Sequence, residues 1–196
     1  WLAHGTLIGW YFGERMQPFD DDVDLQMNSN YLYELAKYNM TLIDGRVRAS
    51  YIFYLLDVNP HFISRHHQRL NVIDARFIDT ETSLFLDITG MALTKVSIRE
   101  SDRVAQMTVK CKTPHRMRPE SIYPLVRTRF EGIGTWRPNE VADMLKKEYG
   151  AMVMSKTLYK VGTCEGVGGA GNGFCGALRV QTWVRRGAAS QDRLNF

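Results

Sequence analysis

Residues 18–27, Pro-Phe-Asp-Asp-Asp-Val-Asp-Leu-Gln-Met, place four carboxylates within five positions between apolar neighbours. From position 23 onward, apolar and polar residues alternate, which is the pattern of a half-buried strand. On such a strand Asp20, Asp22 and Asp24 would lie on one face, about 6.6 Å from one to the next. The stretch therefore predicts a strand that presents several like charges together.

Charges this close raise each other's pKa unless a cation neutralises them. Mg²⁺ and Mn²⁺ suit such a site, because they take one or two carboxylates and complete their shell with water and phosphate oxygens. A solvated acidic loop is the structural alternative. An EF-hand is excluded, because its sixth and twelfth positions, counted from Asp20, are Leu25 and Tyr31 instead of Gly and Glu.

The 196 residues, 44% of them hydrophobic, are enough for one globular domain. A net charge of +4 is too small to indicate a nucleic-acid partner. No apolar run reaches the roughly 18 residues that a membrane span needs. The chain opens at Trp1 without an initiator Met, so we take it to be N-terminally truncated, with any membrane anchor outside this sequence.

Hydrophobic periodicity predicts the remaining elements. A helix is expected from about residue 28 to 40, a buried strand at 51–58, short strands at 122–126 and 130–133, and a helix at 139–149. Two further strands, 71–78 and 83–89, flank a polar turn and predict a hairpin. The segment 151–196 is glycine-rich and is expected to be a flexible tail.

Asp87 lies within the otherwise apolar second strand of that hairpin. Burying its charge alone would cost several kcal/mol, so it requires a partner. One candidate is a metal ion shared with Asp22 and Asp24; the other is Arg76 on the neighbouring strand. The pattern favours neither alternative.

Gly5 and Thr6 open a short helix or turn just before the acidic strand. Glycine lets the backbone approach a phosphate closely, and N–H groups beside a hydroxyl can hold an anion. Together with the carboxylates they indicate metal-assisted phosphoryl transfer, in which a metal holds a diphosphate and stabilises the transition state. One carboxylate could also accept the proton of an acceptor hydroxyl.

The chain resembles the LicD/fukutin family of phosphotransferases, and the sequence of its motifs is most similar to the fungal branch associated with mannosylphosphorylation. The resemblance rests on ordered motifs over about residues 1–150: HGTLIG (4–9), PFDDDVD (18–24), LDVNP (56–60), NVIDARFID (71–79), LDIT (86–89), CK (111–112), YPL (123–125), FEG (130–132) and EYG (148–150).

This resemblance implies an α/β (α+β) nucleotidyltransferase fold of the polymerase β type, with a mixed, largely antiparallel sheet flanked by helices. The acidic strand and the Asp87 strand are expected side by side. Residues 1–150 would form this domain, and 151–196 a divergent tail. The implied setting is the secretory pathway, with a Golgi membrane enzyme whose catalytic domain is lumenal.

The implied reaction transfers mannose phosphate from GDP-mannose to a mannan-type glycan and releases GMP. By motif, the Mg²⁺ or Mn²⁺ ligands would be Asp20, Asp22, Asp24 and Asp87, the last three also being catalytic, and Gly5 with Thr6 would form the phosphate cradle. We further expect three basic side chains to grip the donor: Arg76, Lys112 and His115.

Two rival functions stay open. A glycosyltransferase also uses an Asp-x-Asp metal site for a nucleotide sugar, but it breaks the sugar–phosphate bond and releases the nucleoside diphosphate. A regulator or accessory subunit could keep the fold without catalysis. The carboxylates argue against the regulator, because a scaffold gains nothing from so costly a cluster.

Overall fold

The computed structural model describes residues 1–45, 52–63, 71–96, 106–112, 115–155, 158–160 and 180–182. Its helices are α1 (His4–Gly13), α2 (Leu32–Ala36), α3 (Pro119–Ile122) and α4 (Val141–Tyr149), with 3₁₀ turns η1 (Ser29–Tyr31) and η2 (Ala151–Met154). Its strands are β1 (Val23–Asn28), β2 (Thr41–Asp44), β3 (Phe53–Val58), β4 (Ala75–Asp79), β5 (Phe85–Val96), β6 (Gln106–Lys110), β7 (Arg116–Met117), β8 (Val126–Phe130), β9 (Ile133–Arg137), β10 (Leu158–Lys160) and β11 (Val180–Thr182).

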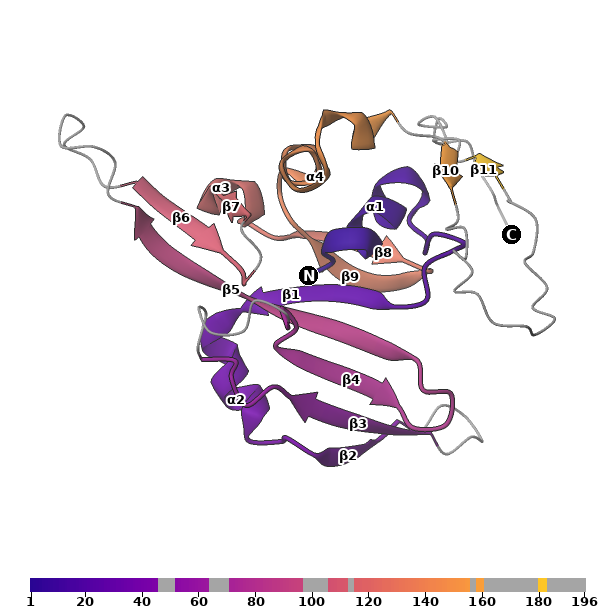
Figure 1. Cartoon of the computed structure of the whole chain (residues 1–196), viewed down its shortest axis with the longest axis vertical. Helices are drawn as coiled ribbons and strands as arrows, with labels where there is room; N and C mark the ends of the chain where they lie inside the picture. Colours follow the sequence, from indigo (N-terminus) through magenta and orange to yellow (C-terminus); the bar gives the residue numbers. More distant parts are fainter. Residues whose placement is uncertain are drawn as a thin grey trace, which may run out of the picture.

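A seven-stranded sheet in the order β2-β3-β4-β5-β6-β7, with β1 added alongside β5, organises the structure (Figure 1). All of its pairs are antiparallel except β1 with β5, which run parallel. The expected α+β fold with a mixed, largely antiparallel sheet is confirmed. So are the β4–β5 hairpin and the side-by-side placement of the acidic strand and the Asp87 strand.

The two faces of this sheet differ in chemistry. Leu56, Val58 and Ala75 turn to one face and pack with Leu32 of α2 into an apolar cluster. Residues at the alternate positions turn to the other face, because side chains alternate along a strand. The register places four charged residues in a row across β3, β4, β5 and β1 on that face: Asp57, Arg76, Asp87 and Asp24.

Helices α1 and α4 and the β8–β9 hairpin form a second layer beyond β1 (Figure 1). Leu7 and Phe12 of α1 pack with Leu145 of α4 in its core. The loop after α1 folds back tightly, since a Cβ on Gly9 would lie 2.4 Å from the carbonyl oxygen of Arg15. Glycine at position 9 therefore lets the chain return directly into the acidic stretch.

A buried ion pair fastens the centre of the sheet. Asp74, just before β4, is fully buried, and its Oδ1 lies 2.9 Å from Nζ of Lys112, just after β6. Asp74 Oδ2 also accepts a hydrogen bond from the backbone N–H of Gly90 in β5, at 2.6 Å. This carboxylate thus links three neighbouring strands, including the one that carries Asp87.

Several expected boundaries were wrong. Strand β1 begins only at Val23, so Asp20 and Asp22 lie in the loop before it instead of on the strand face. Asp disfavours strands, and a loop lets the like charges spread. The helix expected to continue to about residue 40, α2, ends at Ala36. The expected strand at 122–126 is replaced by the end of α3 and an extended turn, and the hairpin turns at residues 131–132.

The chain after residue 150 contains some regular structure. Val153 of η2 is buried in the core with α1 and α4, and β10 pairs with β11. The glycine-rich stretch at 166–171 lies outside the described residues, as does most of the expected tail. Within the described part of the chain, no helix combines the length and the apolar character that crossing a bilayer requires.

We predict that Lys112→Met lowers the free energy of unfolding by about 3 kcal/mol, because it leaves the Asp74 charge buried without its cation. Arg118→Met is the matched control: its pair with Glu140 is exposed, so its loss should cost about 1 kcal/mol or less. Urea denaturation of both variants measures the difference. Equal losses would contradict the buried role of Lys112.

Candidate functional site

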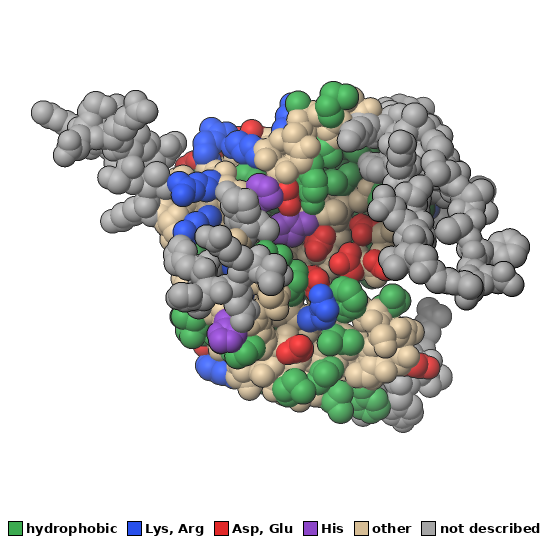
Figure 2. All heavy atoms as spheres, viewed as in Figure 1, with side chains coloured by type: hydrophobic (Ala, Val, Ile, Leu, Met, Phe, Trp, Pro, Cys, Tyr) green, Lys and Arg blue, Asp and Glu red, His purple; other side chains and the backbone are tan. Residues whose placement is uncertain are grey.

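The acidic side chains converge where the start of β1 meets the first turn of α1. An Oδ2 atom of Asp20 and one of Asp24 each lie 3.4 Å from the point where a Cβ of residue 5 would stand. Figure 2 shows acidic side chains gathered in the middle of the face, with a basic side chain beside them. The cluster thus faces solvent across the polar face of the sheet.

Helix α1 holds both the side chain and the backbone of Asp24. The backbone N–H of Gly5 donates to its Oδ2 at 3.1 Å, and its own backbone N–H donates to the hydroxyl of Thr6 at 2.8 Å. Thr6 is buried. The expected Gly-Thr pair is therefore at the site, but both groups are directed at Asp24, so their position indicates that they orient this carboxylate.

Gln17 connects Asp20 to the same turn of α1. Its Nε2 donates to the carbonyl of Gly5 at 3.0 Å and to Oδ2 of Asp20 at 3.4 Å, and its side chain is buried. The acidic loop is thus held against the helix although it lies outside the strand. Sequence reasoning missed Gln17, because a polar residue before Pro18 reads only as part of a turn.

The cluster carries more negative charge than its surroundings balance. Burial raises the pKa of Asp24 to about 6, with further contributions from Asp22 and Asp20, although His4 and the Gly5 N–H oppose them. Burial and the charge of Asp22 also raise the pKa of Asp20. When a carboxylate resists ionisation in this way, a bound cation relieves the unfavourable negative charge. Cation binding therefore gains more free energy here than at an isolated surface carboxylate.

Asp87 is balanced, in contrast. Arg76 donates to both of its oxygens, from Nε at 2.6 Å and from Nη2 at 2.9 Å. The guanidinium also stacks on Phe85, 3.9 Å from the ring centroid. Of the two partners that the sequence left open for Asp87, the structure has Arg76. With both oxygens engaged, Asp87 holds this Arg beside the cluster.

His4 completes the site and was assigned no role from the sequence. Its Nδ1 contacts Glu148 of α4, and its Nε2 lies 3.2 Å from the hydroxyl of Thr89 and 3.1 Å from Nε2 of Gln26. Burial alone would lower the pKa of His4, but Glu148 and Asp24 outweigh it and raise the pKa. No sequence pattern predicts this contact, because 144 positions separate the two residues.

The two other residues expected to contact the donor are Lys112 and His115. The side chain of Lys112 is only 3% exposed, and its ammonium group is paired with Asp74. It is therefore not accessible to a nucleotide-sugar donor. His115 lies just before β7, and its buried Nδ1 has no hydrogen-bond partner among the described residues. Of the three basic residues expected to grip a donor, Arg76 is the one whose contact with a carboxylate of the site is described.

The donor set fits a hard divalent cation. Among the described residues no group of three or more Asp, Glu, His or Cys side chains is placed so that it could hold a metal ion by itself. Mg²⁺ does not require one, because it is usually held by one or two carboxylates together with water and substrate phosphates. The two carboxylates that converge near Gly5, with Asp22 close by, provide this kind of open site.

We predict that Asp24→Asn stabilises the metal-free protein. The folded-state pKa of about 6 exceeds the usual 3.8, so ionised Asp24 costs stability as pH rises through 6. After allowance for solvent screening, the gain should be about 2 kcal/mol at pH 7.5 and below about 1 kcal/mol at pH 4. Urea denaturation at both pH values measures it. The exposed control Glu34→Gln should change little, and a loss of stability in Asp24→Asn would refute the charge argument.

Comparison with known proteins shows the family of the chain. Residues 1–140 match the family described as LicD/FKTN/FKRP, nucleotidyltransferase domain. Two curated proteins of Saccharomyces cerevisiae are similar over 102 residues: Mannosyltransferase regulator 4, at 42% identity, and Mannosyltransferase regulator 14, at 37%. The similar segment covers 51% of this chain but only 9% and 11% of those two proteins.

The family match spans α1, the acidic loop, the whole seven-stranded sheet and the β8–β9 hairpin, and ends just before α4. It therefore includes every carboxylate of the cluster and both residues of the Arg76–Asp87 pair. The expected resemblance to the fungal mannosylphosphorylation branch agrees with the two yeast relatives. The chain belongs to the LicD/FKTN/FKRP nucleotidyltransferase domain family.

Proposed function

We propose that this domain is a metal-dependent phosphotransferase, which moves a phospho-sugar from a nucleoside diphosphate sugar to a glycoprotein glycan. One observation carries the proposal: Asp20 and Asp24 converge on the first turn of α1 with a raised pKa and too little positive charge to balance them. A bound cation would neutralise the two carboxylates and attract its diphosphate ligand. The free energy that their ionisation costs in the metal-free protein would then favour binding.

Asp22 and Asp24, with Asp20, would hold Mg²⁺ or Mn²⁺. When bound, the metal would stabilise the negative charge that develops on the transferred phosphoryl group. Arg76, oriented by Asp87, would contact the phosphate from the other side. Asp20, whose pKa is raised, is suited to accept the proton of the attacking hydroxyl.

The family and the yeast relatives support a role in mannosylation in the secretory pathway. Within it, we propose GDP-mannose as the donor and a mannan-type glycan as the acceptor, with GMP as the released nucleotide. We also propose that the domain works in the Golgi lumen, tethered by an anchor outside this chain.

A regulatory role is the second candidate, because both yeast relatives are named regulators. In that case the domain would bind a nucleotide sugar or a partner transferase without transferring phosphate. Since the carboxylates would still bind a cation, cation binding alone does not distinguish the candidates. The nucleotide released does.

We predict that the protein, incubated with GDP-mannose, Mn²⁺ and a mannan acceptor, releases GMP. Asp22→Asn and Asp24→Asn should each lower the rate by at least about a hundredfold, because each removes part of the electrostatic stabilisation of the transition state. Chromatography of the nucleotides measures this. GDP as the product would establish a glycosyltransferase, and the absence of any nucleotide product with either metal would favour the regulator.

We also predict that Mn²⁺ affinity, measured calorimetrically with GDP present, falls as pH drops through about 6, because protons compete with the metal for Asp24. Between pH 7 and pH 5 the loss should be about tenfold.

Asp24→Asn should bind Mn²⁺ weakly and lose most of this pH dependence. Glu81→Gln, in the exposed turn after β4, should follow the unmodified protein. An unchanged pH dependence in Asp24→Asn would remove Asp24 from the metal site.

A further inference from the structure

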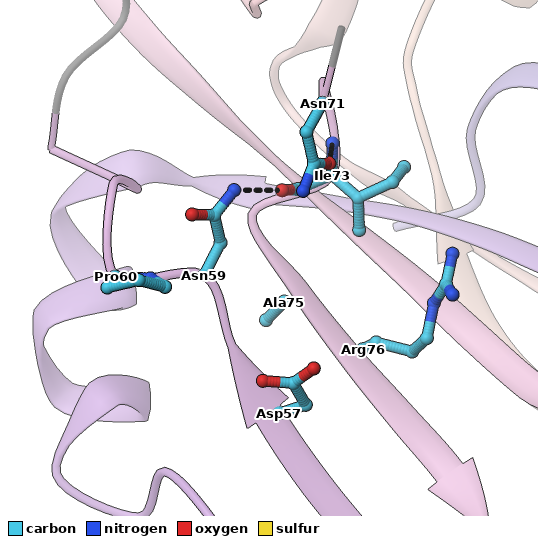
Figure 3. A pocket seen from close by; sticks show the side chains of 7 residues that line it. All are labelled: Asp57, Asn59, Pro60, Asn71, Ile73, Ala75 and Arg76. Atoms are coloured by element: carbon cyan, nitrogen blue, oxygen red, sulfur yellow. Dashed lines mark hydrogen bonds between the residues drawn. The ribbon is translucent and has the colours of Figure 1, made fainter. Parts of the chain in front are cut away.

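A polar pocket of about 220 Å³ lies on the sheet and shares Arg76 with the site described above; its other lining residues have no role in the proposed function. Figure 3 shows Asp57 of β3 and Arg76 of β4 at one end, Asn59 and Asn71 at the other, and Ala75 between them. All of these residues lie in the described part of the chain.

The pocket offers both hydrogen-bond acceptors and donors. Asp57 is exposed, and within the described residues its carboxylate makes no hydrogen bond or ion pair. Arg76 gives two of its five N–H groups to Asp87, which leaves three for a ligand. Asn71 accepts from the N–H of Ile73 at 3.1 Å through Oδ1, so its Nδ2 has two donors to offer.

The walls are held in place by the fold. Asn59 donates through Nδ2 to the carbonyl of Ile73 at 3.0 Å, and its Oδ1 accepts from the N–H of His61. Ile73 and Pro60, which also line the pocket, add an apolar surface beside the polar groups. A rim that both donates and accepts, around an apolar patch, matches a sugar ring with its hydroxyl edge and its C–H face.

Other ligand classes fit poorly. A phosphate would meet the negative charge of Asp57, and a nucleobase would find no aromatic ring among the residues that line the pocket. The volume is below the roughly 300–1,000 Å³ of pockets for drug-sized molecules, which limits the occupant to about one sugar ring.

We propose that this pocket binds a single uncharged hexopyranose unit, either the sugar of the donor or a terminal residue of the acceptor glycan. The proposal rests on the phosphotransferase function, because Arg76 belongs to both sites. A phosphate held near the carboxylates would lie on one side of this guanidinium, and the sugar attached to it, or about to receive it, on the other.

Saturation-transfer NMR with methyl α-mannoside, without metal or nucleotide, tests the proposal. The protein should bind the sugar with millimolar affinity. Asp57→Asn, which keeps the shape of the side chain, and Asn71→Asp, which keeps its Oδ1 acceptor, should each weaken binding at least about fivefold. Glu81→Gln is the control and should bind as the unmodified protein does.

Competition identifies the source of the sugar. Displacement of methyl α-mannoside by GDP-mannose but not by GDP would place the donor sugar in the pocket, whereas simultaneous binding with GDP-mannose would place the acceptor there. Either result supports the proposal. Absence of sugar binding to the unmodified protein, or unchanged binding in both Asp57→Asn and Asn71→Asp, would overturn it.

Failure of the phosphotransferase function would give a different result. Sugar binding requires no turnover, and Asp57→Asn should still bind Mn²⁺ with GDP by calorimetry. If the protein binds the sugar but releases no GMP, the proposal of a sugar pocket stands and the proposed phosphotransferase function fails. If the protein releases GMP but binds no sugar, the phosphotransferase function stands and the sugar pocket fails.

Discussion

The parallel register of β1 against β5 is the constraint on which the site depends, because it sets Asp24 directly opposite Asp87. Two carboxylates at neighbouring positions cannot both stay ionised without compensation. The fold gives Arg76 to Asp87, whereas Asp24 has the charge of His4 and the backbone N–H of Gly5. The register thus distinguishes two chemically equal residues: Asp87 is paired with a guanidinium, and Asp24 keeps a raised pKa.

The sequence predicted the sheet well because its signals are local. Alternation defined β1, and a polar turn between apolar runs defined the β4–β5 hairpin. Site contacts were harder, because partner choice depends on register and on distant segments. Arg76 could be named as a partner of Asp87 but not preferred over a metal. The contact of His4 with Glu148 and the orientation of Gly5 and Thr6 toward Asp24 had no signal in the sequence.

Catalysis and regulation draw on the same arrangement. The cation and diphosphate binding proposed for the acidic cluster would be needed both by an enzyme and by a nucleotide-sugar sensor. What separates them is the acceptor hydroxyl, which must reach the phosphoryl group beside Arg76. In the proposed function, the polar row across β3, β4, β5 and β1 would give donor and acceptor one continuous surface. A sensor would need only the part that binds the nucleotide sugar.

The contact between His4 and Glu148 also bears on how the domain forms. It closes a loop of 144 residues, so it belongs to the least local contacts of the chain, and such contacts form late in folding. During synthesis, α1 and the acidic loop emerge long before α4. The carboxylates therefore remain without the His4–Glu148 contact until the ribosome has released α4, and a nascent chain at that stage carries the acidic side chains of the site without their final arrangement.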